Sequence, residues 1–270
     1  MKTKHLPLFG SAVTCVIAMV VLAGKAEAQS AKAFFKDGPG MNRVDQYPGK
    51  PGDGWATAWA VRKVKTVDML STVEGAPANP HLNIWMSVLD GAADYNNGAV
   101  VRLYDQADKD HTIRFKIKVE KTAGLPSSAD FVGAFGGESP ASNFNPKSTW
   151  VVRTIGKTPE QWRWGAYDGL ADGGSYDGSL MKEIGGLGQG MKVAIGRTYA
   201  FTITNHPQKG TYDVLVSDGA NSVETQNLKY RTTEVDWATP QAGLAFQAQG
   251  REVGNLLVFS VSEVEIAPAP

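Results

Sequence analysis

The sequence predicts an all-β protein built as a two-sheet antiparallel β-sandwich. Three observations predict it: apolar and polar residues alternate along several segments, short polar turns separate these segments, and no long amphipathic helical stretch is found. The chain has 30 glycines and 14 prolines, which supply the turns. Because each alternating strand has one apolar face, a second sheet must cover that face, and two stacked sheets are the simplest arrangement that does so.

Strands are expected where apolar residues fall at every second position. Residues 111–120 give the clearest case, because apolar side chains share one face and charged side chains share the other. The apolar face holds Ile113, Phe115, Ile117 and Val119. Further strands are expected at residues 61–70, 84–89, 99–104, 150–155, 198–204, 211–217, 243–247 and 255–266. Polar turns are expected to join strands at 105–110, 205–210 and 217–221 as hairpins.

The N-terminus predicts export. A positive start is followed by an apolar run over residues 12–24 and by the small-x-small site Ala26-Glu27-Ala28. This order is typical of a cleavable signal peptide, here residues 1–28. A membrane anchor is the alternative, but the run is shorter than the roughly 20 residues that a spanning helix needs. We therefore expect a secreted or periplasmic protein of bacterial type, with no membrane attachment after cleavage.

Cleavage after Ala28 sets the expected domain organisation. Residues 29–49 are expected to form an N-terminal extension or first strand, 50–266 a single sandwich domain, and 267–270 a tail. Cys15 is the one cysteine and leaves with the signal, which excludes disulfides and thiolate chemistry from the mature chain. The signal also removes three lysines and one glutamate, leaving 24 basic and 26 acidic residues. This balance excludes a nucleic-acid binder, which would show a basic excess.

Several segments resemble a known family. Gly52-Asp-Gly-Trp55 stands near the mature N-terminus, 196–203 and 211–218 have the pattern of paired central strands, and 255–261 has that of a final strand. Over most of residues 50–266, these segments resemble bacterial secreted domains of the concanavalin A-like lectin/glucanase superfamily, the laminin-G-like jelly rolls. The resemblance implies a jelly-roll sandwich whose last strand lies beside its first. It selects no activity, because this superfamily holds lectins, hydrolases, lyases and adhesion domains.

An aromatic cluster indicates a glycan-binding site. Residues 161–165 read Gln-Trp-Arg-Trp-Gly, which places both indoles on one side of an extended segment. Exposed indoles stack on sugar rings, and polar neighbours then fix the orientation of the sugar. The expected site consists of Trp162, Arg163, Trp164, Tyr167 and Tyr176. The alternative is that these aromatic side chains belong to the core, where Trp55, Trp59 and Trp85 are expected.

A basic groove is the candidate enzyme site. A lyase acting on uronic-acid polymers needs a cation or amide beside the sugar carboxylate, and a Tyr, His or Lys that removes a proton. Two neighbouring segments offer Arg102, Tyr104, His111, Arg114 and Lys116. The alternative is that the charged residues of 111–120 form the solvated face of a strand. The Gln-Ile-His string of jelly-roll alginate lyases and the Glu-x-Asp-x-x-Glu strand of related glucanases are absent from the sequence.

An oxygen-rich loop is the candidate metal site. Asp168, Asp172 and Asp177 lie in a glycine-rich stretch, and Ca²⁺ takes about six to eight oxygen ligands from flexible loops. One structural Ca²⁺ ion is therefore the cofactor to expect. The alternative is ordinary turn chemistry, in which Asp-Gly pairs are common. The histidines lack the spacing of a zinc site, and no Gly-x-Ser-x-Gly elbow for serine catalysis is present.

Three functional hypotheses follow. The first is a secreted, lectin-like carbohydrate-binding protein whose partner is a polysaccharide or cell-surface glycan. The second is a polysaccharide-degrading enzyme, with a uronate lyase acting by β-elimination favoured over a glycoside hydrolase. The third is a structural secreted domain without a small ligand. We prefer the first, because it needs only the fold, export and a surface site. The sugar and the oligomeric state stay open.

Overall fold

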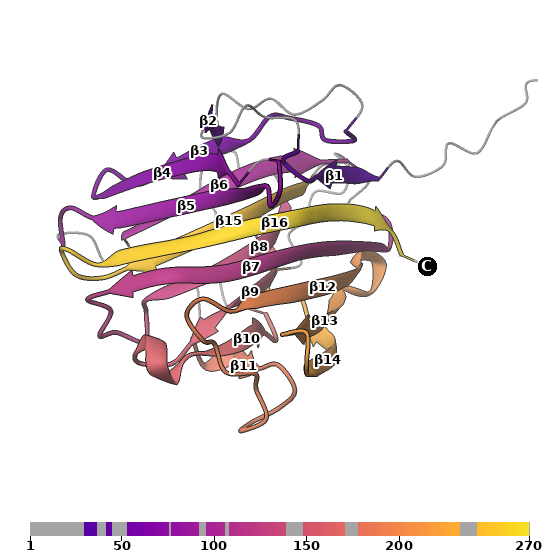
Figure 1. Cartoon of the computed structure of the whole chain (residues 1–270). Helices are drawn as coiled ribbons and strands as arrows, with labels where there is room; N and C mark the ends of the chain where they lie inside the picture. Colours follow the sequence, from indigo (N-terminus) through magenta and orange to yellow (C-terminus); the bar gives the residue numbers. More distant parts are fainter. Residues whose placement is uncertain are drawn as a thin grey trace, which may run out of the picture.

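The structure is a computed structural model, and it describes residues 30–36, 42–44, 53–75, 77–91, 96–105, 108–138, 148–170, 178–232 and 242–269. The predicted signal peptide, residues 1–28, lies outside these residues. Antiparallel strands form two sheets that lie face to face (Figure 1), so the predicted sandwich is confirmed. The helical segments include the short 3-10 turns η2 (Pro159–Gln161), η4 (Gly178–Leu180) and η5 (Pro207–Lys209). No helix in the described residues is long and apolar enough to cross a membrane.

Sheet A contains the first and the last described strands. Its spatial order is β14 (Ser222–Lys229), β13 (Thr211–Ser217), β12 (Thr198–His206), β7 (His111–Ala123), β16 (Leu256–Pro268), β5 (His81–Val88), β4 (Val67–Glu74) and β2 (Asn42–Arg43). A further short strand, β1 (Ala31–Ala33), also pairs with β16. The expectation that the final strand lies beside the first is therefore confirmed, and residues 29–49 contribute two short strands to the sandwich.

Sheet B covers the inner face of sheet A. Its spatial order is β11 (Met181–Glu183), β10 (Arg163–Tyr167), β9 (Ser148–Ile155), β8 (Phe131–Glu138), β15 (Ala242–Gly250), β6 (Asn96–Tyr104) and β3 (Ala60–Lys63). Every neighbouring pair of strands in the sheet is antiparallel. In Figure 1, β15, β6 and β8 lie behind β16, β5 and β7, which gives the two layers.

The core lies between the inner faces of the two sheets. Phe115 of β7 stacks on Phe201 of β12 with ring centroids 5.1 Å apart, and it meets Phe246 of β15 edge-on at 5.4 Å. Phe115 therefore contacts both layers from one alternating position. Full burial of such a side chain stabilises a fold by about 1.5–3 kcal/mol. The alternation seen in the sequence thus supplies the interior that holds the domain together without disulfides.

Several strands do not follow the alternation rule, and β8 and β14 show the two reasons. β8 reads Phe-Val-Gly-Ala-Phe-Gly-Gly-Glu, and residues 131–137 are buried on both faces, so apolar and small residues follow one another directly. Gly136 pairs with Trp150 of β9, and a Cβ at Gly136 would lie only 2.1 Å from the indole nitrogen. β14 is an edge strand with mostly exposed residues, so its sequence has few apolar positions to alternate.

Two of the three predicted hairpins are confirmed and one is wrong. Residues 205–210 join β12 to β13, and residues 217–221 join β13 to β14, as paired neighbours. Residues 105–110 instead connect β6 in sheet B to β7 in sheet A. A polar turn shows that the chain reverses, but not that the strands on either side pair. The last strand also extends to Pro268, inside the predicted tail of 267–270.

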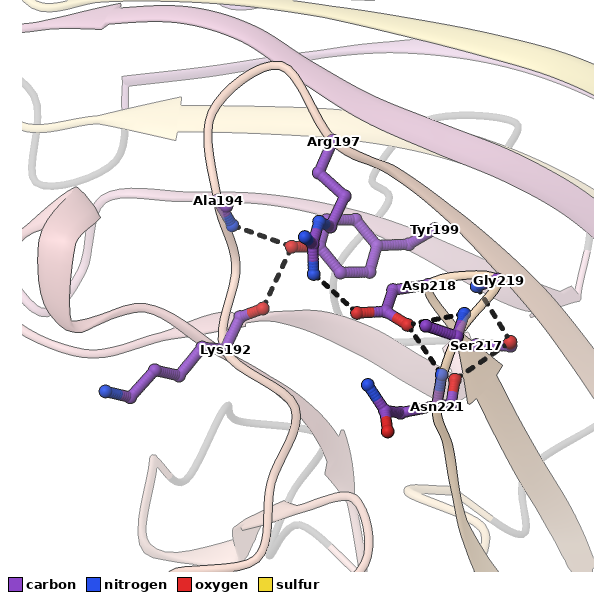
Figure 2. Close-up of polar contacts among 9 residues, drawn as sticks. Lys192, Ala194, Arg197, Tyr199, Ser217, Asp218, Gly219 and Asn221 are labelled. Atoms are coloured by element: carbon purple, nitrogen blue, oxygen red, sulfur yellow. Dashed lines mark hydrogen bonds and ion pairs between the residues drawn. The ribbon is translucent and has the colours of Figure 1, made fainter.

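A buried tyrosine fastens the β12–β13 hairpin to the loop that precedes it (Figure 2). The Tyr199 hydroxyl donates to the Lys192 carbonyl at 2.9 Å and accepts from the Ala194 backbone N–H at 2.7 Å. Burial raises the pKa of Tyr199, which keeps its proton available for donation. One side chain therefore satisfies two backbone groups of a loop that has no strand partner for them.

Asp218 lies in the turn between β13 and β14 and links that turn to Arg197, just before β12. One carboxylate oxygen pairs with Arg197 at 2.6 Å, and the other accepts the backbone N–H groups of Ala220 and Asn221. These backbone hydrogen bonds hold the pKa of Asp218 below its usual value. We call the bonded group of Figure 2 the Tyr199–Asp218 cluster. It accounts for the polar residues at the ends of the two resembling segments, 196–203 and 211–218.

Candidate functional site

The predicted aromatic site lies in the core. Trp162 and Trp164 are 0% exposed, and the Trp164 ring meets Phe201 and Tyr199 edge-on at 4.8 and 5.4 Å. Both indoles belong to the core between the sheets, so the side that they share is the interior of the sandwich. A sugar cannot stack on a ring that has no exposed surface. The prediction that this pair forms a surface stacking site is therefore wrong.

The other described members of the predicted aromatic site do not form a surface glycan-binding site either. Tyr167 is also fully buried. Arg163 donates to the Gly190 carbonyl and lies 3.9 Å from the Glu183 carboxylate, so it attaches the loop after β11. Tyr176 lies outside the described residues. The described members of the predicted site serve packing and loop attachment.

The predicted basic groove does not form, because β6 and β7 belong to different sheets. Arg102 of β6 is 3% exposed and points into the sandwich. There it pairs with Asp53 at 2.8 Å, and its guanidinium carbon lies 4.8 Å from the centre of the Trp55 ring. A cation that is paired and covered in this way is not available to a sugar carboxylate. The expectation that Arg102 faces the groove is wrong.

Arg114 and Lys116 lie on the outer face of sheet A, away from Arg102. Both side chains are well exposed, and they form ion pairs with carboxylates of β16: Arg114 with Glu265 at 3.8 Å, and Lys116 with Glu263 at 2.7 Å. The alternative given by the sequence, a solvated face of an amphipathic strand, is the arrangement found.

Tyr104 and His111 do meet, but inside the molecule. The Tyr104 hydroxyl lies 3.0 Å from His111 Nε2, and His111 Nδ1 lies 2.6 Å from the Lys109 carbonyl. Because a carbonyl only accepts, Nδ1 carries the hydrogen and Nε2 accepts from Tyr104. Burial raises the pKa of Tyr104 and lowers that of His111. The two side chains form a neutral hydrogen-bonded chain with no free group to remove a substrate proton.

The predicted calcium loop is described only at its start. Asp168 accepts the backbone N–H of Lys229 at 3.0 Å, whereas Asp172 and Asp177 lie outside the described residues. Within the described ranges, no group of three or more His, Cys, Asp or Glu side chains is placed to hold a metal ion. Calcium at Asp168, Asp172 and Asp177 stays a prediction.

A cleft lies where the edges of the two sheets come close. β3 is the last strand of sheet B. In the described structure β2 pairs with β4 only at Thr72 and Val73, so the earlier part of β4 pairs with β5 on one edge and has no described strand on the other. Between these edges is a cavity of about 370 Å³, which we call the β3–β4 cleft. It is lined by Arg43, Trp59, Ala60, Val61, Arg62, Lys63, Met69, Leu70 and Ser71.

Trp59 is the aromatic wall of the β3–β4 cleft. Its ring packs on Trp55 and Phe246, with centroids 5.5 and 6.2 Å away, and only 2% of the residue is exposed, as expected for a core tryptophan. The indole Nε1–H has no hydrogen-bond partner among the described residues. A buried donor left in this state costs about 1–3 kcal/mol of stability.

Ser71 is the second unpartnered polar group of the cleft. It lies on β4 among positions that point inward, such as Met69 and Val73, and it is 1% exposed. Its hydroxyl has no partner within the described part of the chain. A serine hydroxyl both donates and accepts, whereas the Trp59 indole only donates. A sugar hydroxyl also does both, so these two groups match the chemistry of a saccharide.

Cations surround the mouth of the cleft. Arg43, Arg62 and Lys63 line it and are exposed, and no carboxylate is among the described residues that line it. Lys63 donates to the Val67 carbonyl at 2.8 Å and lies 3.8 Å from the Asp68 carboxylate outside the cleft. The described lining therefore combines a buried tryptophan, two unpartnered polar groups and three basic side chains at the rim.

Another unpartnered side chain lies on the outer face of sheet B. Both amide atoms of Gln247 are buried and without partners among the described residues. Ala99 and Gly133 flank it in register, and Arg153 follows on the next strand. These neighbours are themselves buried, so the described residues leave no opening toward Gln247. The β3–β4 cleft is the stronger candidate because exposed residues form its rim.

Sequence reasoning missed this cleft. Alternation around Trp59 correctly predicts a core residue, but it contains no information on where two sheet edges leave space between them. Alternation also misplaces Trp85, which is half-buried on an outward position of β5 instead of in the core. The one usable signal for the cleft is the basic run Arg62-Lys-Val-Lys65 within the predicted strand 61–70.

Comparisons with known proteins support the fold and give no family. No protein-family model matches the sequence, and no curated protein matches it. A sialidase structure matches with a TM-score of 0.51 and 10% identity, over 90% of this chain and 19% of the sialidase chain. The Ca²⁺- and Man3GlcNAc-bound exoplasmic/lumenal domain of VIP36 gives 0.48 and 8%, over 90% of this chain and 89% of that one. The lectin UEA-II with galactose gives 0.45 and 11%, over 77% and 97%. The predicted likeness to the concanavalin A-like lectin fold is confirmed as a likeness of fold alone.

Proposed function

We propose that this protein is a secreted, lectin-like carbohydrate-binding protein that holds a polysaccharide or cell-surface glycan in the β3–β4 cleft. The observation that carries the proposal is the cleft itself, a cavity of about 370 Å³ lined by Trp59 and Ser71, whose polar atoms have no partner among the described residues. A saccharide carries hydroxyls that both donate and accept hydrogen bonds, and a few convergent polar groups in a cleft suit them. The signal-like residues 1–28 support export.

An enzymatic function has less support. The residues predicted for β-elimination do not converge on one surface, since Arg102, Tyr104 and His111 are buried while Arg114 and Lys116 lie on the outer face of sheet A. General acid–base catalysis requires the base within hydrogen-bonding reach of the substrate proton. Binding needs no such constellation, so carbohydrate binding is the more economical function for this cleft.

A glycan array with the purified mature protein, with and without Ca²⁺, tests the proposal. The best ligand is then titrated calorimetrically against the Ser71→Ala variant. Because the Ser71 hydroxyl has no partner, its removal leaves folding stability unchanged or slightly higher, while glycan affinity falls by about tenfold. Thr211→Val is the matched control: Thr211 of β13 also has an unpartnered hydroxyl, and it does not line the cleft. Its affinity stays at the wild-type value.

Each other outcome overturns a stated part of the proposal. Failure to bind any glycan, with or without Ca²⁺, leaves a structural domain without a small ligand. Wild-type affinity in the Ser71→Ala variant would show that the glycan binds outside the β3–β4 cleft. Shortening of the bound polysaccharide during the titration would show that the protein is an enzyme and not only a binding protein.

A further inference from the structure

We infer that the carbohydrate site continues from the β3–β4 cleft onto the outer face of sheet A, where Trp85 stacks on a sugar ring of a neutral, linear polysaccharide. The inference rests on the proposed carbohydrate binding and adds the class of ligand. It uses the tryptophan that was expected in the core and that the structure places on an outward position of β5.

Trp85 differs from the tryptophans of the core. Its neighbours along β5, Ile84 and Met86, are fully buried between the sheets, so the Trp85 side chain points outward. There it is half-buried, and among the described residues its ring meets no other aromatic ring and its Nε1–H makes no hydrogen bond. Trp164, by contrast, is fully buried and packs against two aromatic rings. A partly exposed indole can stack on the apolar C–H face of a pyranose ring.

The Trp85 indole is the centre of an apolar row that crosses three neighbouring strands. Trp85 pairs in register with Leu70 of β4 on one side and with Val258 of β16 on the other, and these strands lie side by side in the front sheet of Figure 1. Leu70 is 45% exposed and Val258 is partly exposed. Because neighbouring strands are about 4.7–4.9 Å apart, the row extends for about 10 Å. Leu70 also lines the β3–β4 cleft, so the row leads into the cleft.

Polar side chains border the apolar row on β4 and β5. On one side of the row, Thr72 pairs with Asn83, and on the other side Asp68 pairs with Ser87, all at outward positions. A polysaccharide chain has a matching pattern, because each ring has an apolar C–H face and a rim of hydroxyls that donate and accept hydrogen bonds. The ring faces would lie on the apolar row and the hydroxyls beside the polar side chains.

The charges along this path favour a ligand without charge. Asp68 and Glu74 lie on β4 beside the apolar row, Lys121 pairs with Val258 at its far end, and Arg62 and Lys63 line the cleft. A chain that crosses the row and enters the cleft therefore passes both carboxylates and cations. An anionic or cationic polymer would be repelled over part of this path, whereas a neutral chain can hydrogen bond to groups of either sign.

Titration calorimetry of the mature protein with cellobiose, cellohexaose and the β-linked hexamer of glucuronic acid tests this inference. The hydroxyls of β-linked glucose are equatorial, so both ring faces present C–H groups. We expect cellohexaose to bind about tenfold more tightly than cellobiose, because only the hexamer reaches both the cleft and Trp85. The glucuronic acid hexamer binds about twofold to fivefold more weakly than cellohexaose at about 50 mM salt. Trp85→Ala lowers the affinity for cellohexaose about fivefold to tenfold and removes most of its advantage over cellobiose, whereas Trp85→Phe, which keeps a ring, lowers it about twofold.

A second pair of variants separates the apolar row from the rest of the same face. Leu70→Ala lowers the affinity for cellohexaose about twofold, because it removes apolar surface next to Trp85. Leu215→Ala is the matched control: Leu215 is also an exposed leucine on the outer face of sheet A, but it lies on β13, away from the row. Its affinity stays at the wild-type value. Urea denaturation of each variant shows whether the fold is kept, and Trp85→Phe carries the test if Trp85→Ala does not fold.

The remaining outcomes overturn the inference or the proposed function separately. Wild-type affinity for cellohexaose in Trp85→Ala, with Ser71→Ala still weakening binding, overturns the Trp85 subsite and keeps the proposed function. Tighter binding of the glucuronic acid hexamer, or a glycan array hit without any binding of cellohexaose, overturns the class of ligand. A dimer in sedimentation that Trp85→Ala dissociates would show that a second copy of the chain covers this face, which also overturns the inference. A blank glycan array overturns the proposed function itself.

Discussion

The Tyr199–Asp218 cluster and the β3–β4 cleft use their polar groups in opposite ways. In the cluster, the Tyr199 hydroxyl makes two hydrogen bonds and the Asp218 carboxylate makes three contacts, all within the described chain. In the cleft, Trp59 and Ser71 each have a buried polar atom without a described partner. Satisfied groups fix a structure, whereas an unsatisfied buried group lowers stability until something bonds to it. The difference separates a region that holds the fold from a region prepared for a ligand.

Topology explains why the two regions differ. The cluster lies at one end of β12 and β13, which pair along seven residue pairs and leave no free edge between them. The cleft lies where β2 covers two residues of β4 and where sheet B ends at β3. Free edges leave space that side chains do not fill, and that space is where a ligand can enter. The comparison predicts that substitutions in the first region change stability and substitutions in the second change binding.

The largest loss of stability is expected for Trp164→Ala, which also tests whether Trp164 is a core residue and not part of a surface glycan site. The indole is fully buried against Tyr199 and Phe201, so its removal leaves a cavity and costs about 3–5 kcal/mol of unfolding free energy, measured by urea denaturation. A stable Trp164→Ala variant that no longer binds glycan would contradict the assignment of Trp164 to the core and support a surface stacking role for its indole.

A smaller loss is expected for Tyr199→Phe. The change keeps the ring but removes the hydroxyl, leaving the Lys192 carbonyl and the Ala194 N–H without their partner. We expect a loss of about 1–3 kcal/mol in the same denaturation assay, with glycan affinity unchanged. An altered affinity with unchanged stability would break the distinction between the two regions.

Gln247→Met tests a buried amide that belongs to neither region. Both of its polar atoms are without described partners, so an apolar side chain of similar length should raise stability by about 1 kcal/mol. Denaturation of the variant beside wild type measures the change. Lower stability would show that the Gln247 amide has hydrogen-bond partners in the folded protein. A loss of glycan binding would show that the outer face of sheet B, and not the cleft, binds the sugar.

The sequence predicts the layers of this protein better than its site. Alternation over 111–120 identifies a strand and the side chains on it that face the core, because the period of two is a direct consequence of backbone geometry. The same pattern cannot tell whether β6 and β7 pair or lie in different sheets, and the groove predicted from Arg102 and Arg114 failed for that reason. Spacing also placed Trp162 and Trp164 on one side without revealing that this side faces the core.

The cleft was beyond sequence reasoning for a different physical reason. A cavity depends on how far two edges stand apart, and that distance is set by which strands end early. No local pattern encodes that the described part of β2 pairs with β4 at Thr72 and Val73. Whether the Ser71 hydroxyl has a hydrogen-bond partner likewise depends on neighbours that are far away along the chain. Local periodicity therefore predicts elements, while the site arises from where those elements stop.

The last prediction concerns pH and compares the buried His111 with hydrogen-bonded carboxylates such as Asp218. Burial lowers the pKa of His111 in the folded protein, whereas the unfolded chain takes up a proton near pH 6.5. Below about pH 6.5 the unfolded state therefore binds more protons, and stability falls as pH falls, at up to about 1.4 kcal/mol per pH unit. Nearby Asp108 and Asp110 favour the charged ring and His206 opposes it, but burial is the largest influence.

Carboxylates such as Asp218 act in a lower window. Their lowered pKa contributes stability that is complete above about pH 4 and is lost as pH falls through the folded value. Urea denaturation of wild type and His111→Gln at a series of pH values separates the two windows. We expect the variant, which cannot take up a proton there, to show a flatter stability profile between about pH 7 and pH 5 and an unchanged slope below about pH 4. Parallel profiles for the two proteins above pH 5 would mean that His111 accepts a proton without cost, which contradicts its place in the neutral chain from Tyr104 to Lys109.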